Sequence, residues 1–145
     1  QAGQPGEVAR GDAAAALDWL QSMNADAKSC WIAGYSFGAW IGMQLLMRRP
    51  EITGFISVSP PANMYDFSFL APCPSSGLMI NGTADRVAPP ADTVTLVDKL
   101  HEQKGITVTH EQVEGAGHFF ENDHMDTMVG SVQSYVKRRL TESSR

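Results

Sequence analysis

Residues 32–40, IAGYSFGAW, join two apolar runs through a single serine, Ser36, which lies between Gly34 and Gly38. A residue without Cβ lets neighbouring backbone come close where a side chain would collide. The stretch therefore predicts a sharp turn from a buried strand into a helix, with glycine on both sides to avoid collisions. In such a turn the serine is held in a strained conformation and its hydroxyl points outward.

Helix-like and strand-like blocks alternate on both sides of this turn. Helical spacing and end residues predict helices over 13–23, with Asp12 as N-cap, and over 37–49, 90–104 and 125–140. Short apolar or alternating runs predict strands over 29–33, 52–59, 77–81 and 106–113, the last at a sheet edge. Strands that alternate with helices indicate a single α/β domain over residues 1–145, with a mainly parallel sheet of about four strands.

Composition narrows the class of protein. The chain has 145 residues, 43% of them hydrophobic, and a net charge of -5, which argues against nucleic acid or an anionic membrane as a partner. It has no apolar run of about 18 residues, and its first residues, QAGQPGEVAR, lack the features of a signal peptide, so we expect a cytoplasmic protein. Cys30 and Cys73 predict neither a disulfide framework nor a zinc site, and we expect buried thiols.

Candidate chemistry falls in loops that follow three of the predicted strands. Ser36 follows the first strand, Asp85 lies in NGTADRVAPP after the third, and His118 lies in EGAGHFF after the fourth. The carboxyl ends of parallel strands open at one rim of the sheet. We therefore expect the three side chains to meet there.

A serine hydroxyl is a poor nucleophile, so it needs a base within hydrogen-bond reach and an acid that orients the base. His118, in a glycine-rich and otherwise apolar turn, is the expected base, whereas His101, His110 and His124 fall in a helix, a strand and a helix start. Asp85 is the expected acid, and Asp66 in the long loop is its main rival. The alternatives stay open: a surface serine in an ordinary turn, a histidine satisfied within its loop, and an aspartate that only shapes a turn.

A metal centre is not expected, because His118 and His124 are six positions apart rather than the four that place two ligands on one helical face. No other cofactor is indicated.

In these residues the chain resembles the α/β-hydrolase superfamily, particularly small bacterial members that look like dienelactone hydrolases but carry serine. GYSFG matches the nucleophile elbow (Gly34, Tyr35, Ser36, Gly38), NGTADRVAP the acid loop, and GAGHFF the histidine loop, in the superfamily's order. The resemblance implies hydrolysis of carboxylic esters: Ser36 attacks, His118 transfers the proton, Asp85 orients His118, and the Phe37 backbone N–H helps to hold the oxyanion.

The resemblance also implies a departure. The family sheet has eight strands, and the first four, with the loop that donates a second oxyanion N–H, have no counterpart here. The apolar strand over 29–33 would then be an exposed edge, so we expect a homo-oligomer or pairing with a missing N-terminal segment. The alternative function is a catalytically impaired remnant that acts as a binding or self-assembly module.

The predicted loop over 60–76 is long, proline-rich and aromatic, as loops that border a site often are. Met64, Tyr65, Phe67 and Phe69, with Leu70, are candidates for an apolar pocket, which favours small hydrophobic esters as substrates. The alternative is that these side chains only cover the sheet.

Overall fold

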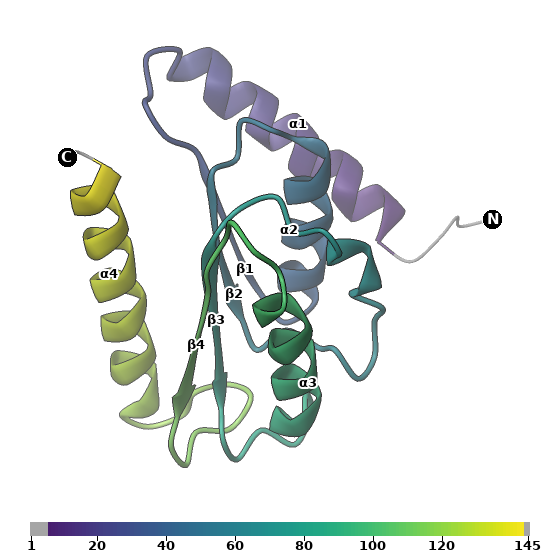
Figure 1. Cartoon of the computed structure of the whole chain (residues 1–145), viewed down its shortest axis with the longest axis vertical. Helices are drawn as coiled ribbons and strands as arrows, with labels where there is room; N and C mark the ends of the chain where they lie inside the picture. Colours follow the sequence, from purple (N-terminus) through teal and green to yellow (C-terminus); the bar gives the residue numbers. More distant parts are fainter. Residues whose placement is uncertain (1–5, 144–145) are drawn as a thin grey trace.

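Four strands form one parallel sheet in chain order: β1 (Trp31–Tyr35), β2 (Gly54–Val58), β3 (Gly77–Gly82) and β4 (Val108–Val113). The computed structural model describes residues 6–143 (Figure 1). Residues 1–5, part of the stretch in which no signal peptide is predicted, lie outside the described residues. The α/β class, the parallel sheet and the edge position of β4 are confirmed.

The helices occur in the predicted order along the chain. They are α1 (Glu7–Met23), α2 (Phe37–Arg48), α3 (Pro90–His101) and α4 (His124–Ser143), and a single 3-10 turn, η1 (Ser68–Leu70), interrupts the long loop after β2. Two of the helices, α2 and α3, connect neighbouring strands. Pro90 opens α3, where the missing N–H costs no helical hydrogen bond.

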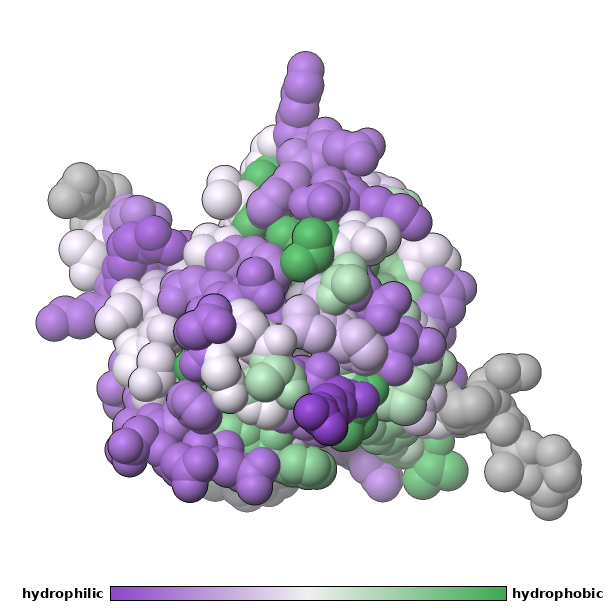
Figure 2. Space-filling view, turned by 90° about the horizontal axis from the view of Figure 1, so that it is seen from below, coloured by the Kyte–Doolittle hydropathy of each residue, from purple (hydrophilic) through white to green (hydrophobic). Residues whose placement is uncertain are grey.

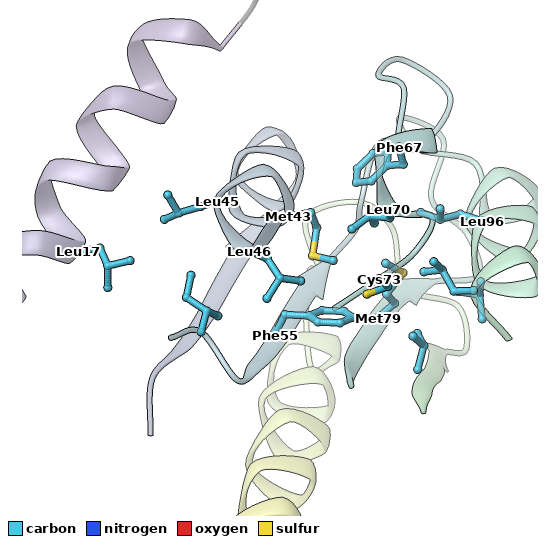
Figure 3. Packing of buried hydrophobic residues seen from close by; sticks show 14 residues of the cluster. Leu17, Met43, Leu45, Leu46, Phe55, Phe67, Leu70, Cys73, Met79 and Leu96 are labelled. Carbon is cyan, nitrogen blue, oxygen red and sulfur yellow. The ribbon is translucent and has the colours of Figure 1, made fainter. Parts of the chain in front are cut away.

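The helices form two layers around the sheet. In Figure 1, α1, α2 and α3 lie on one side and α4 lies alone on the other. The larger core packs under α2 and α3, where Met43, Leu46, Phe55 and Met79 are almost fully buried (Figure 3). A smaller core, which includes Tyr135, fills the space under α4. Both faces of β2 and β3 are therefore covered, as their continuous apolar sequence requires.

Several predicted boundaries differ from the structure; α3, for example, ends at His101 rather than at residue 104. Asp12 is not an N-cap but lies inside α1, which begins at Glu7 after Gly6 in a left-handed conformation (φ 81°). The first strand does not span 29–33 but 31–35, because its register with β2 runs from Trp31 opposite Gly54 to Tyr35 opposite Val58. The strand therefore reaches the residue before Ser36.

β1 has one open side. Thr53 donates a backbone hydrogen bond to Cys30 and Ser36 donates one to Val58, so the even-numbered residues of β1 face β2. Alternate residues of a parallel strand bond to opposite sides, so Trp31, Ala33 and Tyr35 turn their backbone groups toward the open edge. Among the described residues, no strand pairs with β1 on that side.

Both cysteines are free thiols; Cys73 is buried and Cys30 is half-buried. None of the helices in residues 6–143 is long and apolar enough to cross a bilayer.

Candidate active site

The carboxyl ends of the four strands lie at one end of the molecule, the lower end in Figure 1, which Figure 2 views directly. Hydrophobic residues reach this surface in separate places among hydrophilic ones. The loops that carry Ser36, Asp85 and His118 all open here, since each follows a strand.

Ser36 joins β1 to α2 in a strained turn. Its φ of 56° and ψ of -121° are rarely adopted by a residue with a side chain, and its N–H donates to the carbonyl of Val58 at 2.8 Å. A Cβ at position 34 would collide with the backbone carbonyl of Gly38, so Gly34 lets the turn close. The sequence also predicted that position 38 needs glycine to avoid a collision. This prediction is wrong, because a Cβ there would meet nothing within 4 Å.

His118 lies between the other two predicted side chains. Its Nε2 is 2.8 Å from Ser36 Oγ, and its Nδ1 is 2.8 Å from Asp85 Oδ2. The carboxylate accepts, so Nδ1 carries the proton and Nε2 is left to accept the serine proton. The side chains of His118 and Asp85 are 4% and 0% exposed, which keeps water from competing for this pair.

The second oxygen of Asp85 fixes the carboxylate. Oδ1 accepts the backbone N–H groups of Val87 and Ala88, each at 2.8 Å. The acid loop is also bonded to the histidine loop, because Ala84 N–H donates to the Ala116 carbonyl at 2.9 Å. A Cβ on Gly82 would collide with that same carbonyl. Acid and base are thus positioned as one unit.

The rival residues lie elsewhere. Asp66 accepts the N–H of Ser68 within its own loop. His101 bonds to the Val108 carbonyl, His110 bonds to Asn81, and His124 is the first residue of α4. Burial is the main cause that lowers the pKa of His110.

Several large side chains near Ser36, Asp85 and His118 in the sequence are exposed. Tyr35, Phe37, Val87 and Phe119 are 43%, 38%, 42% and 62% exposed, and the Phe119 ring packs edge-on against the imidazole of His118. Val87 and Phe119 were missed by the sequence analysis. A simple rule would have found them: each lies within two positions of a predicted site residue.

Phe37 is the first residue of α2, so its N–H is among the first four of the helix, which have no helical acceptor. This position fits its predicted part in an oxyanion hole, since helix N-termini favour negative charge.

The predicted pocket residues are spread over several surroundings. Phe67 is 5% exposed and belongs to the core, Met64 is 52% exposed, and Phe69 packs against the core. Tyr65 and Phe67 line a cavity of about 320 Å³ between the long loop and α3, together with Leu96, Lys99 and Leu100. Its lining includes none of Ser36, Asp85 and His118, and the pocket assignment stays a prediction.

A serine in a sharp turn from strand to helix, on a parallel sheet with helices on both faces, is the arrangement found in the α/β-hydrolase fold. The chain belongs to the dienelactone hydrolase family, whose model matches residues 2–144. The predicted resemblance is thereby confirmed.

Related proteins agree with this placement. The chain is 60% identical to ATU1826 of Agrobacterium tumefaciens, a protein of unknown function; the match covers 98% of this chain and 65% of that one, with a TM-score of 0.92. XC6422 of Xanthomonas campestris, an α/β serine hydrolase without a lid, is 28% identical, with 95% of this chain and 60% of that one covered and a TM-score of 0.78. The uncharacterized protein RP471 of Rickettsia prowazekii is 51% identical over 119 residues, 79% of this chain and 49% of its own length.

Proposed function

We propose that this chain carries the nucleophile, base and acid of a serine hydrolase that cleaves small carboxylic esters. The observation that supports the proposal most directly is the continuous hydrogen-bonded series from Ser36 Oγ through the His118 imidazole to Asp85 Oδ2, with 2.8 Å at both steps. Membership of the dienelactone hydrolase family agrees with hydrolysis as the reaction.

Acylation begins when Ser36 Oγ attacks the ester carbonyl carbon and its proton passes to His118 Nε2. The tetrahedral intermediate carries its negative charge on the former carbonyl oxygen. The imidazolium then donates its proton to the alkoxide as the bond to the alcohol breaks, which leaves an acyl ester on Ser36. Asp85 stabilises the imidazolium without taking its proton.

Deacylation repeats these steps with water. His118 Nε2 takes a proton from the attacking water, the acyl–oxygen bond to Ser36 breaks, and Oγ recovers the proton. The net reaction converts an ester and water into a carboxylic acid and an alcohol.

The Phe37 N–H would supply one hydrogen bond to the oxyanion. Loss of one oxyanion donor typically lowers kcat by about 10² to 10³, so we expect the rate to depend on this N–H. Hydrolysis should be faster for esters with a good leaving group.

The surroundings of the serine favour apolar substrates of modest size. The exposed ring of Phe119 packs against the His118 imidazole and offers apolar contact there. Phe37 and Val87 are also exposed and lie within two positions of Ser36 and Asp85 in the sequence. Met64 and Tyr65, which the sequence analysis names as pocket candidates, would extend this contact if a bound acyl or alcohol group reached the long loop.

The test is labelling by a fluorophosphonate, which phosphonylates an activated serine and releases fluoride, together with hydrolysis of p-nitrophenyl acetate. We expect the unmodified chain to label and turn over and Ser36→Ala to lose both. Ser22→Ala is a matched control, because Ser22 Oγ donates only to the Trp19 carbonyl of α1. Labelling that persists in Ser36→Ala would exclude Ser36 as the nucleophile.

A second candidate function is a binding or self-assembly module without useful catalysis. The open side of β1 favours it, because unpaired backbone groups of an edge strand are a template for another strand. The occupant would be a second copy or a separate polypeptide segment that adds a strand. Association and catalysis are compatible, so the two proposals need separate tests.

Light scattering at several concentrations tests the association. We expect the unmodified chain to form a dimer or larger species, and Ala33→Lys to shift it toward the monomer, because a charge at an edge strand opposes pairing. A strictly monomeric chain at all concentrations would exclude self-association. If neither labelling nor turnover accompanies association, the module is the better description.

A further inference from the structure

The backbone carbonyl oxygen of His118 receives two side-chain hydroxyl groups. The Tyr35 phenol donates to it at 2.8 Å, and Ser59 Oγ, from the residue after β2, lies 3.5 Å away. Neither contact involves the imidazole, and neither is needed for proton transfer. Both nevertheless act on the residue that must hold the base in place.

The Tyr35 contact closes a ring of bonds around the reacting atoms. Tyr35 directly precedes Ser36, and His118 Nε2 is 2.8 Å from Ser36 Oγ. The tyrosine ring also lies beside the imidazole, with 5.5 Å between ring centroids. Nucleophile and base are therefore joined twice, once through the imidazole and once through the phenol.

The histidine loop needs such support. Phe120 and Asn122 have φ values of 50° and 60°, in the left-handed region that non-glycine residues seldom adopt. A segment with this strain keeps its shape only where surrounding contacts determine it. Two further contacts, Ala84 N–H with the Ala116 carbonyl and Gly115 N–H with Thr83 Oγ1, involve residues before His118 and come from the acid loop. The Ser59 contact with the His118 carbonyl is longer, at 3.5 Å. Tyr35 ties His118 itself to the strand that carries the nucleophile.

Burial, with a further contribution from the Asp85 charge, raises the pKa of the Tyr35 phenol above its usual value. The phenol therefore remains a hydrogen-bond donor throughout the pH range in which a histidine base works.

We propose that Tyr35 is a positioning residue, whose hydroxyl holds the His118 backbone so that Nε2 stays within hydrogen-bond distance of Ser36 Oγ. This inference rests on the proposed hydrolase function. Small displacements of a catalytic group reduce the rate far more than they reduce binding. Loss of the phenol should thus lower kcat and leave KM unchanged.

The test compares Tyr35→Phe with Tyr135→Phe. Both remove one phenol oxygen and one hydrogen bond, but the Tyr135 hydroxyl contacts Arg139 within α4, away from the three site residues. For p-nitrophenyl acetate we expect Tyr35→Phe to lower kcat about tenfold to a hundredfold, with KM changed less than twofold and fluorophosphonate labelling slowed in proportion. Tyr135→Phe should keep the kcat of the unmodified chain.

Hydrogen–deuterium exchange gives a readout that does not depend on activity. We expect the peptide over residues 114–122 to exchange faster in Tyr35→Phe and at an unchanged rate in Tyr135→Phe. Unchanged exchange, or faster exchange with full kcat, would overturn the positioning role. Lower kcat with unchanged exchange would also overturn it, since the phenol would then act by another route.

The two proposals fail in different ways. An unmodified chain without labelling that depends on Ser36 would refute the hydrolase proposal. Exchange in the Tyr35→Phe variant would still decide whether the phenol holds the loop.

Discussion

The rim around Ser36 and the cavity between the long loop and α3 differ in what each provides. At the rim, a hydroxyl, an imidazole and a carboxylate are joined by two hydrogen bonds of 2.8 Å, beside exposed apolar side chains. The cavity has a volume of about 320 Å³ and is lined by apolar side chains such as Leu96 and by charged ones such as Asp92 and Lys99. No lining residue belongs to that set of three. The cavity and the three hydrogen-bonded polar side chains therefore lie in different places in this chain. The position of a cavity is thus a poor guide to where the reaction would occur.

Replacing one carboxylate in each region tests most directly whether the reaction depends on the rim and not on the cavity. We expect Asp85→Asn to lower kcat by about 10⁴, because an amide that donates to Nδ1 selects the wrong imidazole tautomer. Steady-state hydrolysis of p-nitrophenyl acetate measures kcat for this variant. Asp92→Asn, which changes a carboxylate at the cavity, is the matched control and should stay within twofold. Equal losses in both variants would remove the distinction between the two regions.

A core substitution under the cavity should affect stability rather than rate. Leu100 is 4% exposed and lines the cavity. We expect Leu100→Ala to lower the free energy of unfolding by about 2–5 kcal/mol, since buried leucine contacts are lost and the void grows. Urea denaturation gives this value, and kcat at a temperature where the variant is folded should be unchanged. A large fall in kcat would show that the cavity takes part in the reaction.

At the rim, the two glycines beside Ser36 should respond differently. Gly34→Ala forces a Cβ into the Gly38 carbonyl, so we expect a loss of about 1–3 kcal/mol of stability. Gly38→Ala meets open space inside α2 and should stabilise the helix by about 0.5–1 kcal/mol. Thermal melts should show a lower melting temperature for Gly34→Ala and a higher one for Gly38→Ala than for the unmodified chain. If Gly34→Ala melts at the temperature of the unmodified chain, the turn is looser than the structure shows.

The smallest effect is expected at His110, which belongs neither to the cavity lining nor to the three residues at the rim. Because its pKa is lowered in the folded chain, chiefly by burial and also by His101 against an opposing effect of Asp98, the unfolded chain binds the proton more readily. This part of the stability is present at neutral pH and is lost as the pH falls below the ordinary histidine range. His110→Gln should reduce the decline in melting temperature between pH 7 and pH 5 by a few degrees. An identical decline in both chains would contradict it.

Local sequence patterns were enough to predict the order of elements and that Ser36, Asp85 and His118 would lie together. Ser36, Asp85 and His118 each follow a strand, and parallel strands bring their following loops to one rim. The start of α1 was not predictable in this way. Gly6 precedes it because a Cβ there would collide with Ile41 and Trp40 of α2, a contact that exists only after the helices pack.

The same reason explains what was missed at the site. Tyr35 was predicted only as a member of the turn, whereas its bond to the His118 carbonyl joins residues 83 positions apart. The cavity likewise depends on how the long loop settles against α3. The aromatic run over 65–69 indicates apolar surface but does not indicate which element that surface will face.

The two oxygens of Asp85 differ in their partners, and this has a consequence for what position 85 tolerates. One oxygen is bound to the turn that leads into α3, so the carboxylate cannot swivel to follow the imidazole. A glutamate would keep the negative charge but extend it by one methylene, and it could satisfy either the turn or the ring, not both. Length, and not charge alone, makes aspartate the residue that fits.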